Sequence, residues 1–402
     1  MEVTATMDNT SITTSVAPTG GVRIPIYLDN TTYNNLQTLR KGYAEIHGYV
    51  SVVVCLFGIV ANIANIVVLN KKNMRTSTNV ILMWLAVADL CTMVEYVPFA
   101  LRFYIFKDPD LVFPENKSYS WMCYLLFHAD FSLTMHSMAI WLTIMLAIFR
   151  FLYVFTTKGS IYCSIKHAKI IILTVYISAV LVCIPNYISN FWSRSNKTIN
   201  NETVMVYTFS QRKEEDPDFE TVFRINYWVQ SILIKLVPCF LLTVLTILLI
   251  TALHKAHKRH VHLKSQGMRK DDVEKHNEHF RTTAMLLAVV ILFLITELPQ
   301  GILTLLMIFM DGLQNELYNP LGDILDIVAL LNNAINFVLY CTMSQQFRDT
   351  FVTTFCRCFT RRSNNTDDTV NSNVSKWAKR HLITANGNST KTTQLQENGQ
   401  MV

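Results

Sequence analysis

Charged residues are scarce in this chain of 402 residues: only 16% are Asp, Glu, Lys or Arg, whereas 51% are hydrophobic. Soluble domains usually have a charged share of roughly 25%. A soluble protein of this composition would also need one very large core, and such cores rarely grow beyond about 250–300 residues. The composition therefore favours a membrane protein that crosses the bilayer several times.

Other chemical signatures are also missing. The nine cysteines lie mostly inside apolar segments, so they give no dense disulfide framework. They include no CxxC pair and no Cys/His cluster at zinc-ligand spacing, which argues against a zinc site. The net charge of +6 is spread over short loops, so it does not indicate binding of nucleic acid. No catalytic constellation is visible, and residues 1–46 lack the basic and apolar regions of a cleaved signal peptide. We expect neither an enzyme nor a cofactor.

Seven apolar segments are long enough to cross a bilayer as helices. The longest would extend about 50 Å, against a hydrocarbon thickness of about 30 Å. The expected spans are His47–Asn70, Asn79–Phe106, Trp121–Phe155, Ala168–Ile188, Ile225–Leu253, Thr282–Met310 and Pro320–Met343. The predicted fold class is therefore an all-α membrane protein, a bundle of seven transmembrane helices.

The basic residues predict the orientation of this bundle. Lys and Arg concentrate in the loops after spans one, three and five and at the start of the tail, whereas residues 311–322 contain none. The positive-inside rule then predicts an extracellular N-terminus and a multi-pass protein of the plasma membrane. The predicted outer glycosylation sites are Asn9, Asn30, Asn116, Asn196 and Asn201.

The chain divides into four predicted regions. They are an outer tail (residues 1–46), the bundle (47–343), an amphipathic helix on the inner surface (344–358) and a disordered cytoplasmic tail (359–402). Phe347, Phe351 and Phe355 share one helix face, which is typical of a helix that lies on a membrane. Cys356 and Cys358 are predicted palmitoylation sites.

Motifs in the spans resemble those of rhodopsin-like G-protein-coupled receptors. They are Asn62, Leu85–Asp89, Leu146–Phe151, Pro238, Leu298–Pro299 and Asn336–Tyr340. Three further stretches, Leu126–Ala129, Thr296–Leu303 and Asn333–Tyr340, resemble the invertebrate myosuppressin-type, FMRFamide-like receptors, of which sex-peptide receptors are near relatives. The resemblance implies a short amidated neuropeptide ending in Arg-Phe-amide as ligand, a heterotrimeric G protein of the inhibitory class, and arrestin as a further partner.

Several motifs depart from the usual pattern of this class. The D-R-Y triplet reads Phe149-Arg150-Phe151, and N-P-x-x-Y has lost its proline and reads Asn336 to Tyr340. By resemblance, Arg150 contacts the G protein, with Phe149, Phe151 and Tyr340 as further coupling residues. The alternative for Arg150 is a snorkelling residue at the inner membrane edge.

The disulfide usual in this class lacks its expected second cysteine here. It joins a cysteine at the outer end of span three to one in the second outer loop. Cys123 could supply the first, but residues 190–224 contain no cysteine, and Cys183 lies within span four. We expect Cys123 to be free or to have an unexpected partner.

Ionisable residues inside the spans are candidates for ligand binding, because exposing them to lipid is costly. The candidates are Glu297, His136, Asp326, Asp323, Glu95, Asp130, Tyr96 and Lys235. His136, Thr143 and Arg150 recur every seven residues and share one inward face, which leaves His136 as a ligand contact or a packing residue. Asp130 lies about 120° around the helix from His136, so a neighbouring helix is its alternative partner.

Glu297 is the most informative of these residues. A carboxylate in mid-span costs a few kcal/mol unless it is paired or neutral. One possible partner is the arginine of the incoming peptide, through a charge-assisted contact. Another is Lys235 in span five, which would make a structural pair, and the third possibility is a protonated Glu297.

Negative charge gathers toward the outer side, through Glu95, Asp323 and Asp326, and would attract a cationic peptide. Tyr96, with Phe99 and Phe103, could take the aromatic terminus of that peptide, or serve only in packing. The main alternative function is a chemosensory receptor for small molecules, which this negative charge opposes. A transporter is less well supported, because internal repeats and Gly-interrupted half-helices are not apparent.

By resemblance, a last group of residues forms the polar network beneath the ligand pocket. Its members are Asp89, Asn62, Asn332 and Asn336. A sodium ion near Asp89 is a further possibility, and no other metal is expected.

Overall fold

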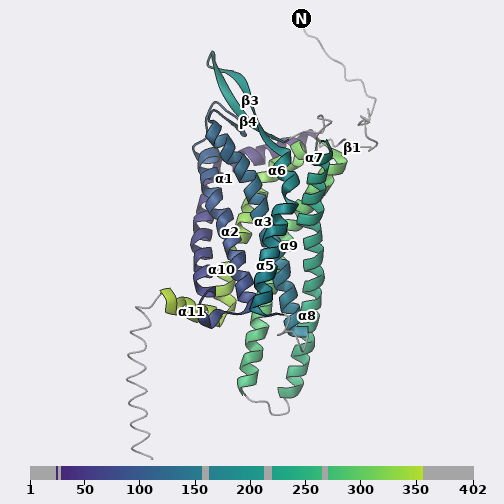
Figure 1. The fold of residues 1–402 in the computed structure, drawn as a ribbon. Coiled ribbons are helices and arrows are strands. Elements are labelled where there is room, and N and C mark those ends of the chain that lie inside the picture. Colours follow the sequence, from purple (N-terminus) through teal and green to yellow (C-terminus); the bar gives the residue numbers. More distant parts are fainter. Residues whose placement is uncertain (1–23, 26–28, 156–162, 212–219, 265–269, 356–402) are drawn as a thin grey trace, which may run out of the picture. The chain divides into compact units, whose positions relative to one another are not determined.

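A computed structural model describes residues 24–25, 29–155, 163–211, 220–264 and 270–355. Contacts divide the chain into two units, Met1–Gln345 and Gln346–Val402. Among the described residues, seven helical stretches are long and apolar enough to cross a membrane, and all lie in the first unit (Figure 1). The predicted fold class, a seven-helix transmembrane bundle, is thereby confirmed.

The seven stretches are Asn30–Leu69, Ser77–Ile105, Tyr119–Leu152, Ile165–Ser189, Arg224–Thr251, Val290–Phe309 and Gln314–Thr342. Several are built from more than one element. The α-helices of the bundle are α1 (Asn30–Leu69), α2 (Ser77–Ala100), α3 (Tyr119–Phe155), α5 (Ile165–Val182), α6 (Ile184–Ser189), α7 (Glu220–Trp228), α8 (Val237–Lys264), α9 (Lys270–Phe309) and α10 (Asn319–Met343). The separate helix α11 (Gln345–Phe355) lies where the sequence predicts an amphipathic helix.

Three helices are longer than the sequence predicts. Helix α1 begins at Asn30 rather than His47, because the Asp29 carboxylate caps it by accepting a hydrogen bond from the Thr32 N–H at 3.1 Å. Hydrogen bonding from Thr32 also lowers the pKa of the Asp29 carboxyl. Helices α8 and α9 continue through much of the predicted basic loop and extend past the other helices (Figure 1). Hydropathy locates the bilayer, whereas a helix continues into water until a capping signal ends it.

Three spans contain π-helical segments, in which each backbone N–H donates to the carbonyl five residues earlier. They are η2 (Leu101–Ile105) after α2, η3 (Val229–Leu236) before α8, and η4 (Gln314–Tyr318) before α10. Such segments are rare and frequently occur at functional sites. Here all three adjoin the polar clusters described below.

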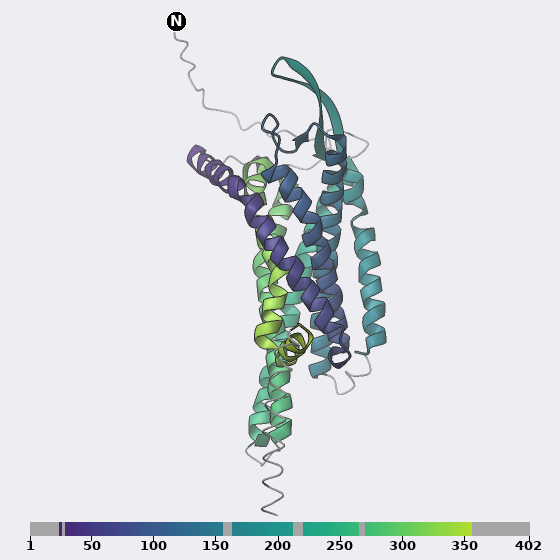
Figure 2. The ribbon, with the colours of Figure 1, turned by 90° about the vertical axis from the view of Figure 1, so that its left-hand side faces the viewer.

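A β-hairpin crosses one end of the bundle, which we call the hairpin end. Strands β3 (Asn190–Ile199) and β4 (Glu202–Gln211) pair antiparallel. Strand β2 (Glu115–Asn116) pairs with the other edge of β4. Asn200 and Asn201 form the turn with φ of 52° and 64°, a conformation that Asn tolerates well and that suits the twist of a hairpin. The sequence predicts only a polar loop here. Figure 2 shows the first turns of α1 leaning away from the other helices at this end.

Candidate functional site

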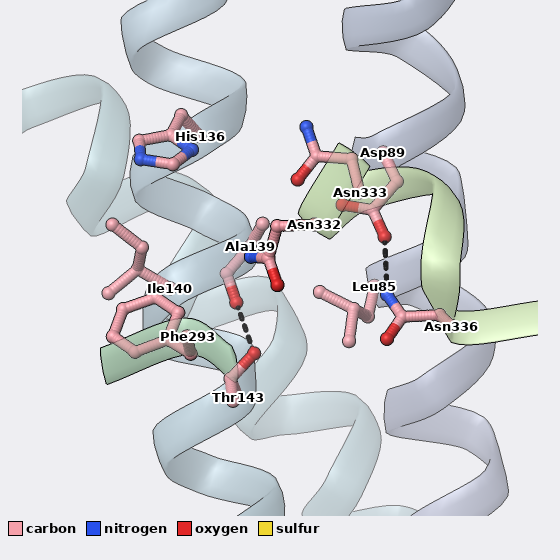
Figure 3. A pocket seen from close by; sticks show the side chains of 10 residues that line it. All are labelled: Leu85, Asp89, His136, Ala139, Ile140, Thr143, Phe293, Asn332, Asn333 and Asn336. Carbon is pink, nitrogen blue, oxygen red and sulfur yellow. Dashed lines mark hydrogen bonds between the residues drawn. The ribbon is translucent and has the colours of Figure 1, made fainter. Parts of the chain in front are cut away.

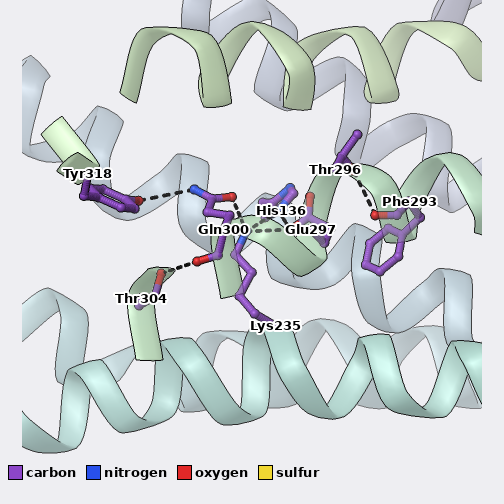
Figure 4. Close-up of polar contacts among 8 residues, drawn as sticks. All are labelled: His136, Lys235, Phe293, Thr296, Glu297, Gln300, Thr304 and Tyr318. Carbon is purple, nitrogen blue, oxygen red and sulfur yellow. Dashed lines mark hydrogen bonds and ion pairs between the residues drawn. The ribbon is translucent and has the colours of Figure 1, made fainter. Parts of the chain in front are cut away.

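A buried polar cluster lies between α3, η3 and α9, and we call it the Lys235 centre (Figure 4). Lys235 Nζ lies 2.5 Å from Glu297 Oε2, 2.8 Å from Gln300 Oε1 and 3.1 Å from His136 Nε2. His136 Nε2 is also 3.0 Å from Glu297 Oε2. Gln300 extends the cluster by donating to the Tyr318 hydroxyl at 3.3 Å. The ammonium thus has three neighbours that can satisfy it.

Burial makes the pairing of Lys235 with Glu297 important for stability. Glu297 is 0% exposed and Lys235 is 6% exposed. An isolated charge at such depth would lose its hydration without compensation. Of the alternatives for Glu297, this structure has the internal pair with Lys235. The sequence did not indicate Gln300 or Tyr318, although Gln300 stands one turn from Glu297 on the same helix.

The close approach of α9 to η3 depends on a glycine. A Cβ atom added to Gly301 would lie 2.9 Å from Lys235 Cβ and 3.4 Å from Leu236 Cδ2. Because real Cβ atoms essentially never approach within 3.0 Å of a non-bonded heavy atom, a larger residue would push the two helices apart. Gly301 therefore sets the spacing at which Lys235 reaches Glu297.

A second cluster lies at the hairpin end, around two carboxylates that we call the outer acidic pair, Asp323 and Asp326. They stand three residues apart on α10, so they occupy neighbouring positions one turn apart. The Tyr104 hydroxyl donates to Asp323 Oδ1 at 2.7 Å, and the Tyr96 hydroxyl lies 3.5 Å from Asp326 Oδ2. Both carboxylates are half-buried, and within the described part of the chain no Lys or Arg makes an ion pair with either.

A histidine of α1 contacts the two tyrosines of this cluster. His47 is fully buried, and its Nε2 lies 3.1 Å from the Tyr96 hydroxyl and 3.3 Å from Ser51 Oγ. The rings of Tyr43 and Tyr104 lie 5.4 Å and 4.6 Å from the imidazole. His47 and Tyr104 are not among the residues predicted from the sequence, although each is an ionisable residue within a predicted span, which is a signal of function.

Glu95 is buried and faces α3 rather than the outer acidic pair. It makes a close hydrogen bond with His128 Nδ1, while its backbone carbonyl accepts from the Tyr124 hydroxyl. The Phe99 ring stacks on His128 with 3.8 Å between centroids. Glu95 Oε2 has no partner among the described atoms. His128 was part of a motif in the sequence but was not identified as a polar partner.

Asp130 serves a different neighbourhood from His136, in agreement with their angular separation on α3. Its Oδ1 accepts hydrogen bonds from Asn186 Nδ2 at 2.9 Å and from Asn190 Nδ2 at 2.7 Å. Asn190 is the first residue of β3, so Asp130 fastens the base of the hairpin to α3. Gln230 donates to Asn186 Oδ1 at 3.0 Å and links this network to η3.

The candidate aromatic residues are buried. Tyr96 and Phe99 are each 4% exposed and Phe103 is 6% exposed, and all three belong to one core cluster. Phe99 and Phe103 also pack against Phe113. In this conformation the three side chains serve in packing. Tyr96 also contacts the outer acidic pair through its hydroxyl.

A small cavity beneath the Lys235 centre is lined by residues of four helices, and its polar residues come from α2, α3 and α10 (Figure 3). Asn336 Nδ2 donates to Asp89 Oδ2 at 3.0 Å, and Asn62 Nδ2 donates to the Asn333 carbonyl at 3.2 Å. The cavity is lined by Leu85, Asp89, His136, Ala139, Ile140, Thr143, Phe293, Asn332, Asn333 and Asn336. The structure thus brings Asp89, Asn332 and Asn336 together. Asn62 joins this group through its hydrogen bond to the Asn333 backbone. Carboxylate and amide oxygens are donors that hard cations prefer, so this set fits a sodium ion.

The predicted coupling residues lie at the opposite end of the bundle from the hairpin. Arg150 and Phe151 are half-buried, whereas Phe149 and Tyr340 are each 3% exposed. The Phe149 carbonyl accepts a weak hydrogen bond from Cys163 Sγ at 3.6 Å. Phe149 and Tyr340 therefore do not present their side chains at the surface in this conformation, because the bundle packs around them.

The predicted glycosylation sites differ in exposure. Asn116 is 2% exposed, and its Oδ1 accepts from the Ser118 N–H at 2.8 Å and from Arg102 at 3.4 Å. Asn30, Asn196 and Asn201 are exposed. Asn9, Cys356 and Cys358 lie outside the described residues. Cys123 and Cys183 are both free thiols.

Comparisons with known proteins agree with this architecture. The family model described as "Serpentine type 7TM GPCR chemoreceptor Srw" matches residues 49–358. A Caenorhabditis elegans protein named G-protein coupled receptor dmsr-1 is 31% identical over 361 residues, covering 79% of this chain and 70% of that protein. Sex peptide receptor-related protein 2 from the same organism is 26% identical, with coverages of 81% and 73%. The sex peptide receptor of Drosophila melanogaster is also 26% identical, with coverages of 76% and 71%.

These relatives are signalling receptors rather than enzymes, and the residues that the family model matches include part or all of each of the seven spans. The family model alone matches well over half of the sequence. The chain therefore belongs to the serpentine seven-transmembrane family of rhodopsin-like G-protein-coupled receptors, as a multi-pass membrane protein related to the sex-peptide receptors.

Proposed function

We propose that this receptor binds a short amidated neuropeptide ending in Arg-Phe-amide or a related sequence, and that it activates a G protein of the inhibitory class. The observation that carries the proposal is the outer acidic pair, two half-buried carboxylates one turn apart without an internal cation among the described residues. Relatives named sex peptide receptor support a peptide as the ligand.

The chemistry of the outer acidic pair suits an arginine. A guanidinium offers five donors in a planar fork and forms bidentate contacts with carboxylates. Tyr104 and Tyr96 each approach one oxygen of Asp323 and Asp326, so the remaining oxygens are available to a ligand. Two negative charges in a half-buried setting also raise the local concentration of a cationic peptide.

Glu297 is a poorer arginine site than the outer acidic pair. Lys235 already neutralises it, and a second cation at this depth would need to displace that ammonium. We therefore assign Glu297, His136 and Lys235 to the floor of the pocket. Glu95 and Asp130 likewise support the pocket through His128 and Asn190.

Further parts of the proposal concern the membrane and the inner side. Residues 1–46 are extracellular, 47–343 form the bundle in the plasma membrane, 344–358 lie on the inner surface, and 359–402 are a cytoplasmic tail. Arg150, with Phe151 beside it, contacts the G protein, while Phe149 and Tyr340 hold Arg150 in place.

Asp89, Asn332 and Asn336 would hold a sodium ion, which supplies a positive charge beneath the pocket. Arrestin, palmitate on Cys356 and Cys358, and a glycan on Asn9 complete the proposed partners and modifications.

A peptide panel tests the ligand. Cells expressing the receptor are stimulated with Arg-Phe-amide peptides, and with the same peptides in which neutral citrulline replaces arginine, while inhibition of cAMP is measured. We expect Arg-Phe-amide peptides to act and citrulline to weaken them by at least about tenfold, the usual contribution of one charge-assisted contact. Asp323→Asn and Asp326→Asn should each remove most of the difference, whereas Asp110→Asn, whose carboxylate pairs with Lys117 in a loop, should not.

The second candidate is a chemosensory receptor for small molecules, because the matching family model carries the description "chemoreceptor". The same panel discriminates the two. Silence toward every amidated peptide from a receptor that reaches the surface would contradict the peptide proposal and favour this candidate.

A further inference from the structure

Tyr104 occupies an unusual backbone segment at the hairpin end of the second span. It lies in η2, where the Phe106 N–H donates to the Leu101 carbonyl five residues earlier at 2.7 Å. The extra residue in this turn rotates the segment relative to the helix before it. The Tyr104 side chain consequently faces α10, where its hydroxyl donates to Asp323 Oδ1 at 2.7 Å.

The position of η2 depends on a glycine in α1. A Cβ atom added to Gly48 would lie 2.6 Å from Tyr104 Cβ, 3.0 Å from Ile105 Cγ1 and 3.5 Å from the Ala100 carbonyl oxygen. These distances are incompatible with any larger residue unless η2 moves. The buried His47 ring, one residue earlier, packs against the Tyr104 ring with 4.6 Å between centroids. Gly48 and His47 thus fix the place from which Tyr104 reaches Asp323.

We infer that Tyr104 is a positioning residue for ligand binding, which aims the Asp323 carboxylate at the cationic group of the ligand, and that the close contact at Gly48 sets this aim. The inference rests on the proposed function, because it assumes that the outer acidic pair receives a guanidinium. The hydroxyl holds Oδ1 of Asp323, so that Oδ2 faces the ligand. Among the described residues, Asp323 has no other hydrogen-bond partner that would fix its side chain in this way.

By holding the Asp323 carboxylate, Tyr104 favours charged ligands over neutral ones. A carboxylate fixed in one rotamer loses little conformational freedom when a ligand binds, so more of the contact energy appears as affinity. The gain is largest for a ligand that pairs with one oxygen of each carboxylate of the outer acidic pair in a defined geometry. A neutral ligand at the same place gains little from this alignment. Tyr104 should therefore control the ratio of affinities for arginine and citrulline peptides more than the affinity of either alone.

The test compares four variants in binding and cAMP assays on intact cells, with receptor number at the surface measured in parallel. Tyr104→Phe removes the hydroxyl and keeps the ring. Gly48→Ala pushes on η2, and Gly42→Ala is its matched control on the same helix, because a Cβ at Gly42 meets nothing within 4 Å. Asp323→Asn is the reference that removes the charge itself.

We expect Tyr104→Phe and Gly48→Ala each to reduce the arginine-to-citrulline affinity ratio by roughly three- to tenfold, with Gly42→Ala unchanged. In the Asp323→Asn background, Tyr104→Phe should have no further effect, because the two residues act through one carboxylate. Unaltered ratios in both Tyr104→Phe and Gly48→Ala, while Asp323→Asn still reduces the ratio, would overturn the inference and leave the proposed function standing. If Asp323→Asn and Asp326→Asn themselves leave the ratio unchanged, it is the proposed arginine site that fails. Should Gly48→Ala not reach the surface, Tyr104→Phe decides alone.

Discussion

Lys235 Nζ lies 2.5 Å from Glu297 Oε2, and this single ion pair joins the fifth span to the sixth in the interior of the bundle. His136 brings the third span to the same two atoms. Three helices thus share one cluster in which each charge depends on its neighbours. Helices α8 and α9 continue from this region toward the inner end of the bundle, so their relative position there is coupled to the pair.

Charge reversal at this pair should destabilise the receptor, and a double reversal should restore it. Glu297→Lys would place two buried ammonium groups together, and breaking such a pair costs about 3–5 kcal/mol. We expect Glu297→Lys to reach the cell surface poorly and Lys235→Glu/Glu297→Lys to recover most of the expression. Thermal unfolding of detergent-purified receptor gives the same comparison in vitro. A Glu297→Lys receptor that folds and reaches the surface normally but loses peptide potency would instead identify Glu297 as a ligand contact.

The spacing of η3 and α9 provides a second test. Gly301→Ala adds a Cβ 2.9 Å from Lys235 Cβ and should lower the free energy of unfolding by about 1–3 kcal/mol, the usual cost of overpacking. Gly322→Ala is the matched control, because its added Cβ meets nothing within 4 Å. The melting temperatures of both purified variants are the measurement. Equal melting temperatures would show that the two helices adjust without cost.

The hairpin should withstand reducing agents. Cys123 and Cys183 are free, and β3 is fastened by the Asn190–Asp130 hydrogen bond at 2.7 Å and by an ion pair between Lys197 and Glu115 at 2.7 Å. We expect dithiothreitol and Cys123→Ser to change peptide affinity by less than about twofold, because no covalent link is lost. A mass-spectrometric map in which Cys123 is disulfide-bonded would contradict this expectation.

Only those acceptor motifs whose asparagine is exposed should be glycosylated. Asn30, Asn196 and Asn201 are exposed, whereas Asn116 is buried in β2. We expect Asn30→Gln, Asn196→Gln and Asn201→Gln each to remove one glycan. The receptor from cells should then migrate faster in electrophoresis, by the mass of that glycan. Asn116→Gln should leave the mobility unchanged, and removal of all glycans by glycosidase provides the baseline. A mobility shift for Asn116→Gln would mean that β2 forms only after the chain has been modified.

The seven spans and the location of the polar residues could be predicted from the sequence. Apolar runs of bilayer length have few alternatives to a helix in hydrocarbon, because every backbone hydrogen bond must be satisfied within the segment. The same reasoning requires that His136, Asp89 and Glu297 face inward, and each is found there. The angular separation of Asp130 from His136 also follows from the residues of α3 alone, because helix geometry fixes it.

The partners of these residues were decided by the tertiary structure. Lys235 and Glu297 are 62 residues apart, Tyr104 and Asp323 are 219 apart, and Asp89 and Asn336 are 247 apart. Whether such atoms meet depends on how far each helix is rotated and shifted against its neighbour, and no local rule sets those values. For the first two pairs, the close contacts at Gly48 and Gly301 and the π-helical segments η2 and η3 help to set these values. The sequence by itself determined that buried charges must find partners, and packing between helices determined which partners they found.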